Sequence, residues 1–185
     1  MNCNVIFRAA EVAARCHEFD CRKYGLKQAY IIHPIRVAGR LMIKKTYLLS
    51  KMSETRFVAM VSAAYLHDVI EDTDATYEDL VEEFGEEIAD LVQEMTNVSK
   101  TSGANREERK KMDRERIKNI SKEGKILKLV DRIDNLEDMS QAPIDFVKLY
   151  TEESELLLKE ALQGTDRYFE MQYEKTLNKL KEMIK

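Results

Sequence analysis

Apolar side chains recur every three to four residues along most of the chain, which is the period of amphipathic helices. The first run predicts a helix that fades near Tyr24 and Gly25; its apolar members are Val5, Ile6, Ala9, Val12, Ala13 and Cys16. A second apolar run extends from Pro34 to Leu41. A helix can begin at Pro34, because proline is well tolerated in the first turn of a helix. His33 therefore stands at a predicted helix entrance.

Residues 57–70 (FVAMVSAAYLHDVI) predict a buried central helix. The strongly polar members of this run are Ser62, His67 and Asp68, so it is too apolar on every side for a surface helix. After a polar break, Thr76 and Asp79 have the spacing of a capping box, which opens a short helix that ends at Gly85. The next helix carries Ile88, Leu91, Val92 and Met95.

The second half of the chain predicts four more helices. A basic helix follows a polar stretch at residues 96–105, and its end is predicted at Gly124. An apolar stripe runs from Ile126 to Leu136, and Pro143 then breaks the chain. The last two helices part near Gly164, and the second spans residues 165–183. The sequence thus predicts an all-α fold of about eight or nine helices, in a single domain over residues 1–185.

Composition excludes several classes of protein. With 6 Gly and 2 Pro in 185 residues, the chain has too few turn-forming residues for an all-β sandwich. It has no run of about 18 uncharged apolar residues, as a membrane span requires, and Arg8 and Glu11 come too early for a signal peptide. A cytoplasmic protein without a membrane partner is expected. Three cysteines, an odd number, favour reduced thiols over a disulfide framework.

Charge is distributed unevenly along the chain. The formal net charge is −4, yet residues 106–125 hold nine Lys and Arg against five acids. The favoured interpretation is a solvated helix with i,i+4 ion pairs, and a phosphate-attracting face is the alternative. An acidic chain without aromatic residues in this segment is a poor nucleic-acid binder, so no nucleic-acid partner is expected.

His67 and Asp68 carry the clearest chemical signal. A carboxylate in an apolar helix is costly unless a positive charge compensates it. The four residues after Asp68 supply no Lys or Arg; they are Val69, Ile70, Glu71 and Asp72. The sequence therefore predicts a divalent metal ion. Mixed His and carboxylate ligands suit manganese, iron, zinc or magnesium, so the spacing leaves the ion open.

Asp131 is a second acid within an apolar run. Its charge is compensated either by a metal ion or by an ion pair with Lys128 or Arg132. Helical spacing places Asp134 or Asn135, and Asp138, along the same shoulder of this helix.

Two other polar positions leave more than one role open. His33 suits either metal binding or a capping or core role. Glu71 and Asp72 suit either a catalytic role or a solvated helix end. The third histidine, His17, is expected to pack rather than bind metal. If His33 joins His67, Asp68 and Asp131, two imidazoles and two carboxylates meet from three helices.

Five segments in order resemble a known family: His33-Pro34, Val37-Ala38, residues 66–73 (LHDVIEDT), residues 128–132 (KLVDR) and Asn135-Leu136. They are similar to the HD superfamily, specifically the hydrolase domain of RelA/SpoT proteins and the stand-alone small alarmone hydrolases. The resemblance spans about residues 9–161. It implies an HD-type helical fold and hydrolysis of the 3′-pyrophosphate of guanosine 3′,5′-bis(diphosphate), ppGpp or pppGpp, to GDP or GTP and pyrophosphate.

The resemblance also implies roles for particular residues. One Mn²⁺ per chain, or another divalent ion, would be held by His33, His67, Asp68 and Asp131. Glu71 and Asp72 would handle the nucleophilic water. The implied partner is a small guanine nucleotide, and the matching substrate-binding residues are Arg22, Lys23, Lys100, Asn135 and Tyr150.

Four positions depart from the family pattern. Asp134 stands where His or Tyr is common and Glu137 where Arg is usual, while Tyr24 and Ala29 replace a small residue and a proline. The added acids disfavour a highly phosphorylated nucleotide. Two alternatives therefore stand beside the alarmone hydrolase: an HD-type phosphatase of another nucleotide, such as a nicotinamide dinucleotide phosphate, and a non-catalytic nucleotide-binding regulator.

Overall fold

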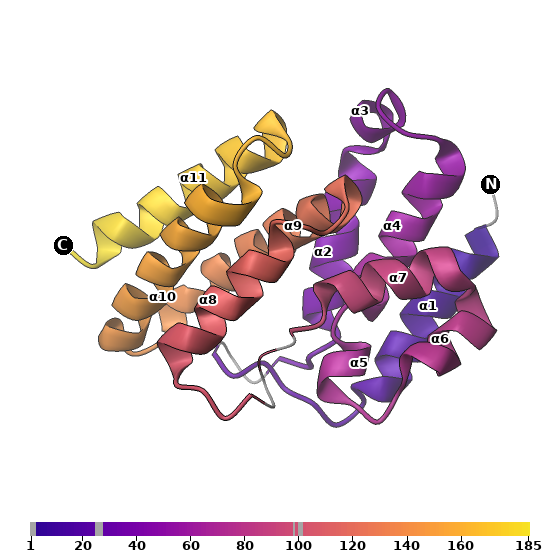
Figure 1. Ribbon diagram of the computed structural model, residues 1–185, viewed down its shortest axis with the longest axis horizontal. Helices are drawn as coiled ribbons and strands as arrows, with labels where there is room; N and C mark the ends of the chain where they lie inside the picture. Colours follow the sequence, from indigo (N-terminus) through magenta and orange to yellow (C-terminus); the bar gives the residue numbers. More distant parts are fainter. Residues whose placement is uncertain (1–2, 25–27, 98, 100–101) are drawn as a thin grey trace. The chain divides into compact units, whose positions relative to one another are not determined.

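The computed structural model describes residues 3–24, 28–97, 99 and 102–185 (Figure 1). These residues form eleven α-helices, one 3-10 turn and one π-helical segment, and their one extended pairing is an isolated bridge between Cys21 and Ala29. The all-α prediction is confirmed. Two helices, α3 (Lys45–Leu49) and α5 (Val69–Asp72), have five and four residues, too few to leave a hydrophobic period in the sequence. None of the helices described is long and apolar enough to cross a bilayer.

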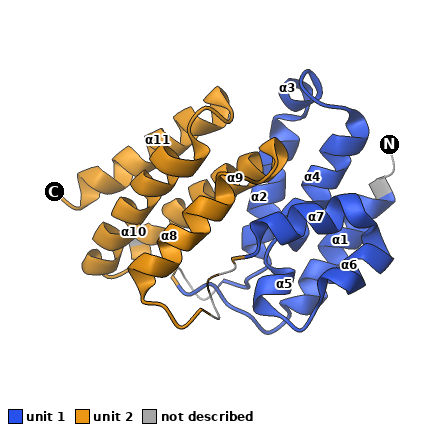
Figure 2. Ribbon diagram, viewed as in Figure 1, with its two compact units in different colours: residues 1–23, 27–96 blue, residues 24–26, 97–185 orange. Residues whose placement is uncertain are grey.

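Contacts along the chain divide it into two compact units (Figure 2). Unit 1 comprises residues 1–23 and 27–96, and unit 2 comprises residues 24–26 and 97–185. Each unit has its own buried helix at its centre. The predicted single domain over residues 1–185 concerns both units together and stays a prediction.

Helix α4 (Glu54–Leu66) is the centre of unit 1. It contacts α1 (Cys3–Cys16), α2 (Ile32–Ile43) and α7 (Glu86–Met95), and eight of its side chains are buried. The apolar run of the sequence therefore identified the core helix. The helix ends at Leu66, however, instead of continuing to Ile70. His67 and Asp68 consequently lie in the turn that joins α4 to α5.

The predicted capping box is present at the start of α6 (Tyr77–Phe84). Asp79 N donates to Thr76 Oγ1 at 3.2 Å, and Thr76 N donates to Asp79 Oδ2 at 2.9 Å. The helix ends at Gly85, whose φ of +83° is accessible to glycine at little cost. Helix α7 begins directly afterwards at Glu86.

The predicted end of the first helix is wrong. Helix α1 stops at Cys16, well before Tyr24. Two hydrogen bonds turn the chain back after it: Asp20 N donates to His17 O at 3.1 Å, and Tyr30 N donates to Asp20 O at 2.9 Å. The second of these bonds joins residues ten positions apart, so a local hydrophobic period does not contain it.

Helix α9 (Lys122–Asp138) is the centre of unit 2 and packs against α11 (Arg167–Met183). The other elements of this unit are α8 (Arg106–Ile117), η1 (Met139–Gln141), α10 (Ile144–Leu157) and the π-helical η2 (Leu158–Leu162). The predicted break near Gly164 is present, since α11 begins at Arg167.

The predicted helix stop at Gly124 is wrong. Helix α8 already ends at Ile117, and Gly124 lies in the first turn of α9. Its N–H donates to the Ser121 Oγ at 3.0 Å, so Ser121 is the N-cap. Ser121, three residues earlier, was therefore a stronger local signal of a helix boundary than Gly124.

Candidate metal centre

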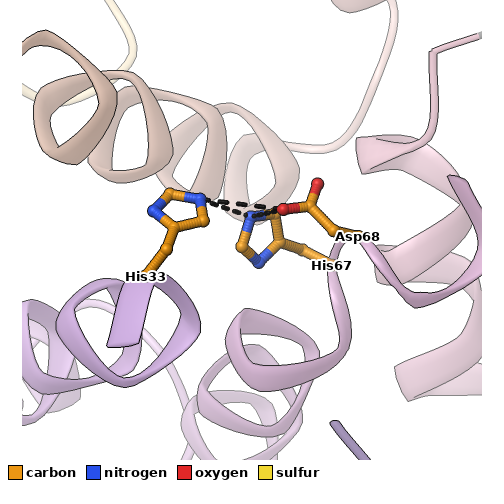
Figure 3. A group of neighbouring side chains, drawn as sticks. All are labelled: His33, His67 and Asp68. Carbon is orange, nitrogen blue, oxygen red and sulfur yellow. Dashed lines mark hydrogen bonds and ion pairs between the residues drawn. The ribbon is translucent and has the colours of Figure 1, made fainter. Parts of the chain in front are cut away.

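Three potential metal ligands converge within unit 1 (Figure 3). His33 comes from the first turn of α2, while His67 and Asp68 come from the turn between α4 and α5. His33 Nε2 lies 3.1 Å from His67 Nε2 and 3.7 Å from Asp68 Oδ2, and His67 Nε2 lies 3.0 Å from Asp68 Oδ2. Both histidines are buried, and the Asp68 side chain is 19% exposed.

A backbone contact fixes the orientation of the His67 ring. His67 Nδ1 lies 2.8 Å from the carbonyl oxygen of Ala64. A carbonyl only accepts hydrogen bonds, so Nδ1 carries a proton, and Nε2 is the ring nitrogen left to coordinate an ion beside His33 and Asp68. This is the tautomer that metal-binding histidines adopt, with the far nitrogen anchored to the protein.

The spacing of the three donor atoms fits one metal ion. The circle through them has a radius of about 1.9 Å, slightly less than the roughly 2.0–2.2 Å at which nitrogen and oxygen bind zinc. A single ion can therefore reach bonding distance from all three atoms. Two neutral imidazoles and one carboxylate would leave an ion of charge +2 with net positive charge, which suits an anionic substrate.

Tyr30 is a site residue that the sequence did not identify. Its hydroxyl donates to Asp68 Oδ2 at 2.6 Å, and its backbone carbonyl accepts from His33 N at 2.9 Å. Tyr30 thus holds one ligand by its side chain and another by its backbone. The sequence feature that could have identified Tyr30 was its position three residues before His33, at the entrance of α2.

The buried His17 supports Tyr30. The two ring centroids lie 4.7 Å apart, and His17 Nδ1 lies 2.8 Å from Asp20 Oδ2. His17 is 2% exposed, so it packs as expected from the sequence.

Tyr30→Phe is expected to weaken Mn²⁺ binding about 10- to 100-fold, as losses of partners behind metal ligands typically do. The substitution removes the donor to Asp68 and keeps the ring that packs on His17. Calorimetric titration of the metal-free protein measures the affinity. Tyr77→Phe is the matched control, because Tyr77 donates a 2.7 Å bond to Asp90 on the surface. Equal Mn²⁺ affinities for Tyr30→Phe and the parent chain would contradict this role.

The two acids Glu71 and Asp72 lie in α5, directly after Asp68. Asp72 N donates to the Asp68 carbonyl at 2.9 Å, which ties the two residues into one helical turn. Asp72 is exposed and Glu71 is half-buried. The turn therefore presents carboxylates beside the candidate metal centre, and their part in the reaction stays a prediction.

Asp131 belongs to α9 of unit 2. Its Oδ1 accepts from Asn135 Nδ2 at 2.5 Å, and its Oδ2 lies 3.4 Å from Lys128 Nζ. The ion pair that the sequence left open as an alternative is therefore present. Metal binding by Asp131 stays a prediction.

The positions that depart from the family pattern differ in burial. Asp134 is buried within α9, and Glu137 is exposed on the same helix. As departures from the family pattern, both acids were expected to add negative charge at the shoulder of the pocket, and this stays a prediction.

The predicted substrate-binding residues occupy both units. In unit 1, the Arg22 guanidinium lies over the Tyr30 ring at 5.6 Å, and Lys23 is exposed. In unit 2, the Tyr150 ring lies 4.6 Å from the Arg132 guanidinium, and Asn135 contacts Asp131. Lys100 lies outside the described residues. Substrate binding by these residues stays a prediction.

The helical fold and the His-His-Asp cluster together define a metal-dependent hydrolase domain of a known kind. Residues 9–157 match the family described as HD domain, and the chain belongs to this family. Among its relatives are guanosine-3′,5′-bis(diphosphate) 3′-pyrophosphohydrolases named MESH1. The protein from Xenopus tropicalis is 34% identical over 137 residues, covering 74% of this chain and 70% of its own length. The protein from Homo sapiens is 33% identical over 170 residues, covering 89% and 88%.

Solved structures agree with this assignment. The chain superposes with a TM-score of 0.81 on a protein described as a metazoan ortholog of SpoT that hydrolyzes ppGpp and plays a role in starvation responses. That alignment covers 95% of this chain and 94% of the other, at 27% sequence identity. The expected resemblance to RelA/SpoT-type hydrolases is therefore confirmed.

Proposed function

We propose that this chain hydrolyses guanosine 3′,5′-bis(diphosphate) at its 3′-pyrophosphate, releasing pyrophosphate and leaving GDP, or GTP from the pentaphosphate. The observation that carries the proposal is the convergence of His33, His67 and Asp68 in a chain one-third identical to enzymes named for this reaction. The same convergence favours an enzyme over a binding module, because binding a nucleotide does not require a metal ligand set. The cytoplasm, where such nucleotides occur, is the proposed location.

His33, His67 and Asp68 would hold a divalent ion, with Asp131 as the proposed fourth ligand and Mn²⁺ as the proposed ion. When bound, such an ion lowers the pKa of coordinated water and polarises a phosphoryl oxygen. The fixed tautomer of His67 and the hydrogen bond from Tyr30 to Asp68 keep the donor atoms in place before the ion arrives. Little reorganisation is then needed on binding.

The acids of α5 would handle the proton of the attacking water. Water adds to the phosphorus atom attached to the 3′-oxygen, the bond between them breaks, and the 3′-oxygen takes up a proton as pyrophosphate leaves. Asp72 or Glu71 would accept the proton of the water. The exposed Asp72 can pass its proton on to solvent, which suits repeated turnover.

Cationic and aromatic side chains would bind the nucleotide. Arg22 and Lys23 would neutralise phosphate charge beyond what the metal ion supplies. The stacking of Arg22 on Tyr30 connects this region to the residue that contacts Asp68. Asn135, Tyr150 and Lys100 would provide further contacts.

Incubation of the purified chain with ppGpp and Mn²⁺ is expected to yield GDP and pyrophosphate in equal amounts, and chelation of the metal should stop the reaction. Nucleotide chromatography and a pyrophosphate assay follow both products. A parallel panel with nicotinamide dinucleotide phosphate and other phosphorylated nucleotides tests the substrate. Good turnover of another nucleotide without turnover of ppGpp would overturn the substrate assignment. Binding of a nucleotide without turnover of any nucleotide in the panel would favour a regulator.

A further inference from the structure

His17 and Asp20 form a compact pair directly after α1. His17 Nδ1 lies 2.8 Å from Asp20 Oδ2, and Asp20 N donates to the His17 carbonyl at 3.1 Å. The carboxylate accepts the first of these bonds, so Nδ1 carries a proton and the bond fixes the rotation of the ring. Asp20 also accepts the Tyr30 N–H with its carbonyl oxygen, at 2.9 Å. Asp20 therefore holds His17 with its side chain and Tyr30 with its backbone.

The segment around Asp20 pairs with the segment that precedes α2. Cys21 and Ala29 form an antiparallel bridge. Side chains alternate between the two faces of such a ladder, so Asp20, Arg22 and Tyr30 share the face opposite to that of the bridged pair. The Arg22 guanidinium accordingly lies 5.6 Å from the centre of the Tyr30 ring. The backbone thus places the Tyr30 ring on the face from which the Asp20 side chain projects.

The second ring nitrogen of His17 is costly where it lies. Nε2 is buried and has no hydrogen-bond partner among the described residues. An unpaired buried polar atom lowers stability, so for packing alone an apolar side chain would suit this position at least as well. The His17 and Tyr30 ring centroids lie 4.7 Å apart, and the Tyr30 hydroxyl donates to Asp68 Oδ2 at 2.6 Å. A side chain that is not the best local choice, in contact with the partner of a metal ligand, indicates a role at that site.

We propose that His17 is a positioning residue of the metal centre and acts through Tyr30 on the carboxylate of Asp68. The bond to Asp20 fixes the imidazole, the imidazole limits the movement of the Tyr30 ring, and the Tyr30 hydroxyl fixes Asp68 Oδ2. A metal site needs its ligands held to within about 0.5 Å, by side chains that packing and hydrogen bonds lock in turn. This role rests on the metal centre of the proposed function and is independent of which nucleotide is hydrolysed.

His17→Leu separates positioning from packing, because leucine fills a similar volume without the flat ring or the bond to Asp20. Mn²⁺ affinity, titrated calorimetrically into the metal-free chain, is expected to fall about 3- to 10-fold. Tm in a chelator should stay within about 3 °C of the parent, since the unpaired nitrogen is removed together with the bond. Parent Mn²⁺ affinity in His17→Leu would overturn the proposal.

Ser62→Ala is the matched control for this variant. Ser62 Oγ is also a buried polar atom of unit 1 without a partner among the described residues. Its removal should leave Mn²⁺ affinity unchanged, because no printed contact connects it to a metal ligand. A loss of Mn²⁺ affinity in Ser62→Ala equal to that in His17→Leu would mean a general effect of core substitutions, and it would overturn the proposal.

Tyr30→Phe shows whether His17 acts by the proposed route. Without the Tyr30 hydroxyl the connection from His17 to Asp68 is broken. Adding His17→Leu to Tyr30→Phe should therefore change Mn²⁺ affinity by less than about twofold, since residues that act through one contact have non-additive effects. A loss in the double variant as large as that caused by His17→Leu alone would show that His17 acts by another route, and would overturn the proposal.

Two variants of Asp20 test the first step without touching the core. The Asp20 side chain is 49% exposed, so its replacement leaves the buried packing intact. Asp20→Ala removes the acceptor of the His17 Nδ1 proton, whereas Asp20→Asn removes the same charge and keeps an oxygen that accepts this bond. Mn²⁺ affinity should be about threefold lower in Asp20→Ala than in Asp20→Asn. Equal affinities would overturn the proposal, even if His17→Leu folds poorly.

Hydrolysis of ppGpp by the parent chain is measured beside these titrations. A parent chain that binds Mn²⁺ without hydrolysing ppGpp would refute the proposed substrate, and the expected differences in Mn²⁺ affinity would still decide the role of His17. A parent chain that binds no Mn²⁺ would overturn both proposals.

Discussion

Asp68→Asn is expected to reduce pyrophosphate release from ppGpp by at least about 10³-fold, because it removes the negative charge from the candidate metal centre. His33 and His67 would remain with Asp131, the proposed fourth ligand, and a site that has lost one of its carboxylates holds a divalent ion more weakly. The amide oxygen can still accept the hydrogen bond from Tyr30, so the fold should persist. The rate of pyrophosphate release and the Mn²⁺ affinity, measured by calorimetry, should fall together.

Asp74→Asn provides the matched control for this loss. Asp74 is an exposed acid two residues beyond α5, so its neutralisation changes the local charge equally and leaves the ligands intact. Circular dichroism and Tm in the presence of a chelator should be alike for both variants and the parent. Undiminished Mn²⁺ affinity in Asp68→Asn would exclude Asp68 as a ligand, and with it the candidate centre.

Asp72→Asn should behave differently, losing turnover while it retains the metal ion. Removal of a general base typically costs about 10²–10⁴ in rate. The exposed side chain of Asp72 contributes little to packing, and the backbone bond from Asp72 N to Asp68 O is unaffected by the change. Steady-state kinetics should therefore show a lower kcat, with Mn²⁺ affinity within about threefold of the parent.

Glu71→Gln, measured alongside, separates the two acids of α5. The acid that accepts the proton should account for most of the loss in kcat. Full activity in both variants would remove α5 from the mechanism. Loss of metal binding in either would indicate that the acid acts as a ligand instead.

The sequence predicted the parts of the structure that local patterns determine. The apolar run at residues 57–70 identified the core helix, and polar residues inside it indicated His67 and Asp68. The capping box at Thr76 and Asp79 fixed the start of α6. In each case the structure is determined by residues that are neighbours in the chain, so a short window of sequence is enough to predict it.

Other features arise from contacts between distant residues and were not predicted. The hydroxyl of Tyr30 reaches Asp68 across 38 positions in the chain. The basic segment was expected to be solvated, yet Asp113 is buried and Arg114 pairs with Glu160. Burial of a charged side chain depends on which helix packs over it, and periodicity within one helix does not contain that information.

The bond between Asp72 N and the Asp68 carbonyl has a consequence for how this segment can vary among relatives. Each residue added between these two positions would rotate Asp72 by about 100° around the axis of α5. A single insertion or deletion would therefore change the direction of the Asp72 side chain relative to Asp68, even with every side chain retained. Natural length variation should fall outside positions 67–72, in segments such as the turn after Thr73, where no such angular relation has to be kept.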